Sequence, residues 1–166
     1  MNQFALLQNK IQQLSKKFDI NNMNNQQELK GIKNGYNWRY IGQVVNGLAE
    51  GKGIRYWNDG ERYEGDFRNG KAEGKGIRYW NDGDRYEGDH RNDKMEGKGI
   101  YYYNKEPFKG DRYEGDFRNG KFEGKGIYYY NDGDRRMGDY YNDNPIGKHV
   151  LLTKNGEVKT KYYYRK

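Results

Sequence analysis

Residues 62–84 read RYEGDFRNGKAEGKGIRYWNDGD and residues 112–134 read RYEGDFRNGKFEGKGIYYYNDGD, two nearly identical copies of one 23-residue unit. Between them, residues 85–111 are the same unit with four extra residues near its end. A looser copy precedes these at 39–61, and a degenerate copy follows at 135–157. Self-similarity at a fixed period indicates a repeat architecture, in which each unit packs against its neighbours.

Each unit is predicted to form a β-hairpin. Residues 62–67 alternate between two kinds of side chain, and the Asn69-Gly70 pair that follows is typical of a two-residue hairpin turn. A second extended run, 74–80, ends in another turn sequence at 81–83. The density of glycine excludes helix in this region, because each interior glycine costs a helix up to about 1 kcal/mol. Five hairpins predict about ten strands in one elongated, twisted antiparallel sheet.

The repeated pattern Y-E-G-D-F-x-N-G-K-x-E-G-K-G-I-x-Y resembles the membrane occupation and recognition nexus (MORN) repeat, over residues 39–157. The resemblance implies an all-β fold, an elongated single sheet of stacked hairpins. It also implies a role in scaffolding, protein contact or phospholipid association. In other proteins such repeats accompany a lipid kinase or a SET methyltransferase domain, and the repeats alone carry over neither activity.

Two glycine columns recur in all five units, and tyrosine stands two residues before the first of them in four units. Glycine within a strand often marks a bulge or a place where another group packs against bare backbone. We therefore expect the tyrosine rings to lie over the glycine backbone. The first glycine column is Gly42, Gly65, Gly88, Gly115 and Gly138, the second is Gly51, Gly74, Gly97, Gly124 and Gly147, and the tyrosines are Tyr40, Tyr63, Tyr86 and Tyr113.

Two further apolar columns are expected to share a face with these tyrosines. In that arrangement one face of the sheet is apolar and the other carries Glu64 and Asp66. A slip of one residue in the pairing would reverse the partition, so it depends on the hairpin register. The columns are Ile54, Ile77, Ile100, Ile127 and Val150, and Tyr56, Tyr79, Tyr102, Tyr129 and Leu152.

Aromatic positions that vary between units are candidates for partner binding. They either form the core of a thin sheet or line a groove that receives a helix or an extended peptide, and one face can serve each purpose. The candidates are Trp57, Trp80, Tyr101, Tyr103, Tyr128, Tyr130, Phe108 and Phe122.

The two ends of the chain differ from the repeats. An amphipathic helix is predicted over about 2–18, within the segment 1–20, and an Asn/Gln-rich linker with a possible half-repeat follows at 21–38. The helix either covers its own sheet or docks on another chain, and a mitochondrial presequence is a lesser alternative. Its apolar stripe is Phe4, Leu7, Ile11, Leu14 and Phe18. Residues 158–166 form either a last edge strand or a basic-aromatic tail, with Lys159, Lys161, Arg165 and Lys166 as candidate contacts to lipid or an acidic partner.

No pattern in the sequence indicates catalysis, a cofactor or a metal site. The chain has no cysteine and two histidines. His90 stands in the column that holds Phe67 and Phe117, which favours a ring substitution over a metal ligand. The stretch from Asn81 to Asp84 resembles part of a calcium loop, but it lacks the glutamate at the twelfth position and is typical of a turn.

The net charge of +7 and pI of 9.3 raise the question of nucleic acid. Residues 1–38 carry +3 and residues 135–166 carry +5, whereas the units between them total −1. Because a nucleic-acid groove would repeat its positive charge along its length, nucleic acid is not an expected partner.

The function expected from the sequence is a non-enzymatic scaffold, a subunit of a larger assembly in a cytoskeletal or ciliary structure. Small-molecule substrates are not expected. The alternative is a peripheral membrane adaptor that binds anionic phospholipid through its basic ends. Both place the protein in the cytoplasm, and mitochondrial import is the lesser possibility named above.

Overall fold

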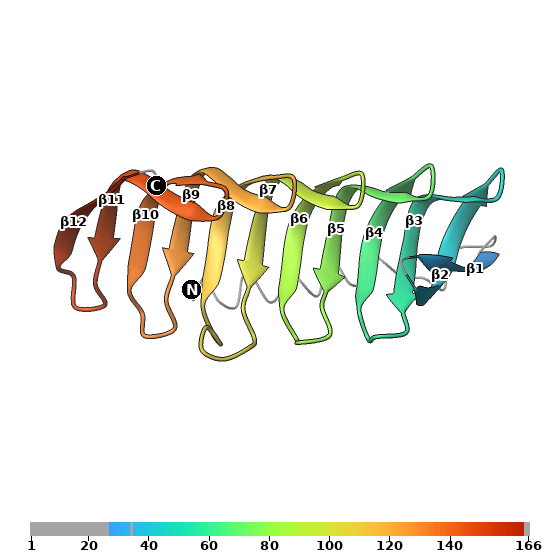
Figure 1. The fold of residues 1–166 in the computed structure, drawn as a ribbon, viewed down its shortest axis with the longest axis horizontal. Coiled ribbons are helices and arrows are strands. Elements are labelled where there is room, and N and C mark those ends of the chain that lie inside the picture. The colour runs from blue at the N-terminus through green and yellow to red at the C-terminus, as the bar shows by residue number, and fades with distance from the viewer. Residues whose placement is uncertain (1–26, 34, 165–166) are drawn as a thin grey trace, which may run out of the picture.

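The computed structural model describes residues 27–33 and 35–164 as one antiparallel sheet of twelve strands, arranged in the order of the sequence (Figure 1). The chain is therefore all-β over its described part, and successive hairpins stand side by side along one long axis. The strands are β1 (Gln27–Lys33), β2 (Tyr36–Val45), β3 (Leu48–Trp57), β4 (Arg62–Arg68), β5 (Lys71–Tyr79), β6 (Arg85–Arg91), β7 (Lys94–Tyr102), β8 (Arg112–Arg118), β9 (Lys121–Tyr129), β10 (Arg135–Tyr141), β11 (Asn144–Leu152) and β12 (Val158–Tyr163).

The five repeats supply ten strands, β2 to β11, as expected, and the sheet extends beyond them by one strand at each end. β1 lies in the segment predicted as linker and half-repeat, where it pairs with β2. At the other end β12 pairs with β11, so residues 158–163 form the edge strand rather than the tail. The predicted helix over 2–18 lies outside the described residues.

Each of the five repeat hairpins combines a tight turn with a bulge. Asn69 and Gly70 have φ of 49° and 75°, the left-handed values that a type I′ turn requires. Beyond the turn, Phe67 pairs with Ala72 and Gly65 pairs with Gly76, so three residues of β5 lie opposite the single residue Asp66 of β4. Bulges of this kind bend the strand and increase its local twist.

The register contradicts the expected partition of the two faces. Ile77 pairs with Glu64, whereas Tyr63 pairs with Arg78. Since paired residues share a face, the isoleucines and the second tyrosine column lie with the glutamates, on the opposite side from Tyr63. We name the two sides the tyrosine face (Tyr40, Tyr63, Tyr86, Tyr113) and the isoleucine face (Ile54, Ile77, Ile100, Ile127).

The core lies on the tyrosine face and consists of rings packed against glycine, as expected. A Cβ atom added at Gly65 or Gly76 would collide with the side chain of Tyr63. The Tyr63 hydroxyl donates to the Asp66 carbonyl at 3.0 Å. Its ring contacts Phe67 edge-on, with 5.1 Å between centroids. Burial raises the pKa of Tyr40 to about 12 and raises that of Tyr63 as well.

Residues 27–33 and 35–164 contain no helix of the length and apolarity needed to cross a membrane.

Candidate functional site

The tyrosine face carries a groove of about 600 Å³ in the second half of the array, which we call the aromatic groove. Its walls come from four consecutive units and include the insertion after Tyr103, so it crosses several strands. The hydrophobic rings dominate the lining and leave a few polar groups among them, as in typical peptide and ligand sites. It is lined by Trp80, Met95, Tyr101, Tyr103, Phe108, Gly120, Phe122, Tyr128, Tyr130, Arg136, Tyr140 and Asp143.

Seven of the eight aromatic candidates from the sequence line this one groove. Neighbouring rings contact one another, with centroids 5.2 Å apart for Trp80 and Tyr101 and 4.8 Å apart for Tyr101 and Tyr103. Phe108, from the four-residue insertion, is 52% exposed at the rim. Trp57 lies away from the groove, beside Trp38. The apolar stripe Phe4, Leu7, Ile11, Leu14 and Phe18 lies outside the described residues.

Two buried carboxylates stand behind the tyrosines of the groove. Asp84 accepts a hydrogen bond of 2.7 Å from the Tyr101 hydroxyl and one of 2.8 Å from a loop amide. Asp111 does the same for Tyr128, at 2.7 Å. Burial, reinforced by the hydrogen bond to the carboxylate, raises the pKa of both phenols, so they stay neutral donors.

Arginine takes the place of these tyrosines in the first half of the array. Arg78 corresponds to Tyr101 and forms an ion pair with Glu61, with 2.5 Å between Nη2 and Oε2. Its guanidinium carbon lies 5.1 Å from the ring centroid of Trp57 and 5.5 Å from that of Trp80. Sequence reasoning singled out the variable column but missed this pairing. The signal is that Glu61 accompanies arginine, whereas Asp84 and Asp111 accompany tyrosine.

The isoleucine face carries a second groove, of about 930 Å³, that sequence reasoning also missed. Its floor is the bare backbone of the paired glycines, and one wall is the isoleucine ladder. The other wall is a row of lysines in ion pairs, such as Lys75 with Asp89 at 2.6 Å and Lys98 with Asp116 at 2.6 Å. These exposed pairs contribute little to stability.

The basic end is accessible where the structure describes it. Lys159 and Lys161 are exposed on the edge strand β12. Lys159 pairs with Glu157 at 3.0 Å, and the Lys161 ammonium lies 5.0 Å from the Tyr163 ring centroid. Arg165 and Lys166 lie outside the described residues.

His90 lies inside the core, where its imidazole packs against aromatic side chains. It is 4% exposed and contacts Tyr63 and Tyr86 edge-on, with centroids 4.7 and 5.0 Å away. Within residues 27–33 and 35–164, no group of three or more histidine, aspartate or glutamate side chains is placed to hold a metal ion.

Replacing His90 by phenylalanine, the residue that its column holds elsewhere, is expected to protect the sheet against mild acid. Burial lowers the pKa of His90 to about 4, below the value of about 6.5 for an unfolded chain. Protonation therefore favours unfolding, and stability falls as the pH drops from 6.5 towards 4. At pH 5 the wild type should lose on the order of 2 kcal/mol relative to His90→Phe.

Urea unfolding of both proteins at pH 7.5 and pH 5 checks this, because the carboxylates they share cancel in the difference. An equal loss in the two proteins would show that His90 is not the group responsible.

The MORN repeat family model matches residues 40–62, 63–85, 86–105 and 113–135, more than half of the chain. No curated protein sequence matches the chain with significance. The fifth unit falls outside the matched residues, yet β10 and β11 form the same bulged hairpin as the other units. MORN repeats are in general protein- or membrane-interaction modules. With four matched repeats on a single open sheet of stacked hairpins, the chain belongs to the MORN repeat family.

Proposed function

We propose that this chain is a non-enzymatic scaffold, a subunit of a larger assembly, and that its aromatic groove holds a segment of a partner protein. The observation that carries the proposal is the gathering of seven variable aromatic side chains in one groove of about 600 Å³. Aromatic residues that line an accessible groove are typical anchors for protein partners, because they bury a large area at low entropic cost. The columns that build the fold are constant, whereas these positions change from unit to unit.

A photo-crosslinking amino acid at position 103 tests this role in cells of the source organism. Tyr103 lines the aromatic groove, whereas Tyr102 belongs to the column on the opposite face, so the adjacent position is a matched control. We expect the photo-crosslinker at position 103 to give a crosslink to one protein, and the same group at position 102 to give much less of that product. Purification as a lone monomer at moderate salt, without a crosslink at position 103, would contradict the proposal.

We further place the assembly in a cytoskeletal or ciliary structure, as the resemblance to other MORN proteins implies. A tagged full-length chain should then stay with the detergent-insoluble fraction of the cell and release at high salt. Complete extraction by detergent at low salt would count against this placement.

The alternative role is that of a peripheral membrane adaptor, supported by the exposed lysines of β12 and the charge of +5 over residues 135–166. Basic segments near anionic lipid gain about 1 kcal/mol per lysine or arginine. The paired change Lys159→Glu and Lys161→Glu should therefore reduce co-sedimentation with phosphatidylserine vesicles at least tenfold. Binding that is equal on phosphatidylcholine vesicles would remove this role.

A further inference from the structure

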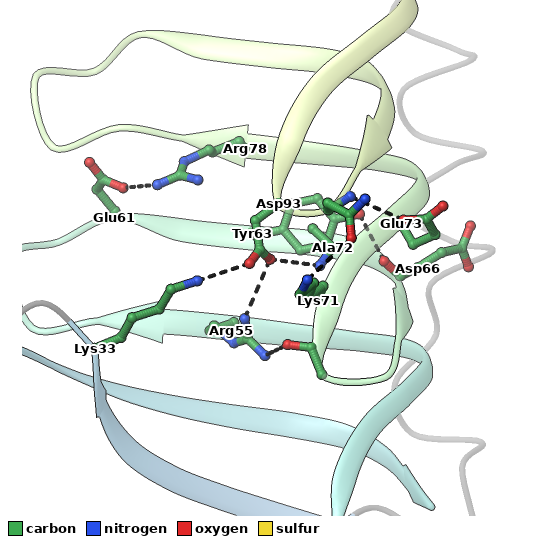
Figure 2. A network of polar contacts seen from close by, with 12 residues as sticks. Lys33, Arg55, Glu61, Tyr63, Asp66, Lys71, Ala72, Glu73, Arg78 and Asp93 are labelled. Atoms are coloured by element: carbon green, nitrogen blue, oxygen red, sulfur yellow. Dashed lines mark hydrogen bonds and ion pairs between the residues drawn. The ribbon is translucent and has the colours of Figure 1, made fainter. Parts of the chain in front are cut away.

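The first half of the tyrosine face contains a buried binding site for a guanidinium group, filled by the chain's own Arg55. Arg55 is only 6% exposed, and its Nη2 donates a hydrogen bond of 2.7 Å to the Gly70 carbonyl. Its Nη1 lies 3.8 Å from the carboxylate of Asp93, in the turn two units further on (Figure 2). The rings of Trp57 and Phe67 flank it, with centroids 5.9 and 4.9 Å from the guanidinium carbon.

The same set of positions recurs two units later without the arginine. Tyr101 stands where Arg55 stands, and Gly120 and Asp143 stand where Gly70 and Asp93 stand. All three line the aromatic groove. Trp57 corresponds to Tyr103, which also lines it, and Phe67 corresponds to Phe117.

The two aspartates are built in the same way. Asp93 and Asp143 are the residues that replace glycine in the Asn-Gly turns, and they have φ of 68° and 70°. Each uses Oδ1 to accept a hydrogen bond of 2.8 Å from a strand of the preceding unit: Asp93 from the amide of Ala72, and Asp143 from the amide of Phe122.

The two copies differ in charge. Asp93 has two cations, Arg55 and Lys33, whose Nζ lies 2.9 Å from Oδ2 (Figure 2). Burial alone would raise the pKa of Asp93, but the hydrogen bonds from Lys33 and Ala72 and the charge of Arg55 bring it below its usual value. Among the described residues no cation forms an ion pair with Asp143.

Negative charge therefore accumulates around the aromatic groove. Asp84, Asp111 and Asp143 surround it, and the guanidinium of Arg136 lies over Tyr128 and Tyr130. Tyr103 lies between these carboxylates, and its pKa is raised, first by burial and then by the negative charge of the three carboxylates. Aromatic faces beside a carboxylate without an ion-pair partner, here Asp143, attract a cation, and a planar guanidinium can stack on the rings while it donates to that carboxylate.

We infer that the aromatic groove binds an arginine side chain of the partner protein. Its guanidinium would lie against Tyr101 and Tyr103 and donate to the Asp143 carboxylate and the Gly120 carbonyl, as Arg55 does in the first half. This inference rests on the proposed function, since it names the chemistry of the segment that the scaffold holds.

A fluorescein-labelled peptide Gly-Gly-Arg-Gly-Gly, titrated with the full chain in fluorescence anisotropy, tests the site directly. The same peptide with citrulline, which is neutral and of the same shape, should bind at least tenfold more weakly. Asp143→Asn keeps the Oδ1 acceptor for Phe122 and should weaken the arginine peptide at least tenfold. Asp93→Asn is the matched control and should leave peptide binding unchanged, because Arg55 already fills that copy. Equal binding of the citrulline and arginine peptides would overturn the inference.

A second variant, Tyr101→Arg, gives the second copy an arginine of its own at the position that corresponds to Arg55. It should keep the circular dichroism spectrum of the sheet and abolish binding of the arginine peptide, and binding that survives would overturn the inference. Three other ligands are tested in the same assay: a lysine peptide, phosphatidylcholine vesicles and a synthetic peptide of residues 1–26. If any of them binds as tightly as the arginine peptide, the inference is overturned. If position 103 crosslinks to a partner but the arginine peptide does not bind, the scaffold role stands and the arginine assignment fails.

Discussion

Replacing Tyr63 by alanine is expected to lower the free energy of unfolding by about 4 kcal/mol, the usual cost of removing a buried aromatic side chain. The ring covers the backbone of Gly65 and Gly76 and lies between Phe67 and His90. A thin sheet cannot close over the resulting cavity, because no second layer can move in. Urea unfolding followed by circular dichroism measures the loss.

Two further variants separate the ring from its hydroxyl and from general effects of tyrosine. Tyr63→Phe keeps the ring but loses the hydrogen bond to the Asp66 carbonyl, so it should cost about 1 kcal/mol. Tyr164→Ala removes a ring that is 86% exposed and should change stability by less than about 0.5 kcal/mol. Similar losses for Tyr63→Ala and Tyr164→Ala would contradict the packing described here.

Adding one methyl group at Gly88 is expected to destabilise the sheet by about 3 kcal/mol, at the upper end of the usual cost of overpacking. A Cβ atom there would lie 2.6 Å from the Gly99 Cα and 2.6 Å from the Lys98 carbonyl oxygen. Both are backbone atoms of the paired strand, which cannot yield without breaking the ladder. The thermal midpoint of Gly88→Ala against wild type measures the effect.

Gly47→Ala is the matched control for this variant. Gly47 has φ of 75° and no atom within 4 Å of an added Cβ, so alanine there meets only the cost of left-handed backbone, about 1 kcal/mol. If Gly47→Ala were the more damaging of the two, conformational freedom and not close approach would explain the glycine columns.

The hairpins could be predicted from the sequence, because the Asn-Gly turns and the alternation of residues 62–67 report local geometry. The stacking of tyrosine on glycine could also be predicted from local sequence, because each tyrosine and its glycine are two residues apart on one strand and therefore lie on the same face. The assignment of the faces was wrong, although the signal was present. The turn pairs Phe67 with Ala72, so Ala72 lies on the same face as Phe67 and Tyr63. The bulge adds two residues to β5, an even number, and therefore does not change which of its residues lie on that face. Ile77 consequently lies on the other face.

The aromatic groove could be predicted only in part. The variable columns were recognised, but the twist of the whole sheet decides which of their members meet. Lys33 and Asp93 are 60 positions apart, yet they form an ion pair because the twist brings one end of the sheet towards a turn in its middle. A 23-residue unit does not contain that information, since the twist accumulates over many strands.

Because the strands follow one another in sequence order, the length of the sheet is set by the number of repeats. Every ladder joins strands that are consecutive in the chain, so one unit more or less would lengthen or shorten the sheet by two strands, roughly 10 Å. Whatever is held at β1 and at β12 is kept apart by a distance that the number of units decides. Duplication or deletion of one repeat would therefore change the distance between β1 and β12 without changing the fold.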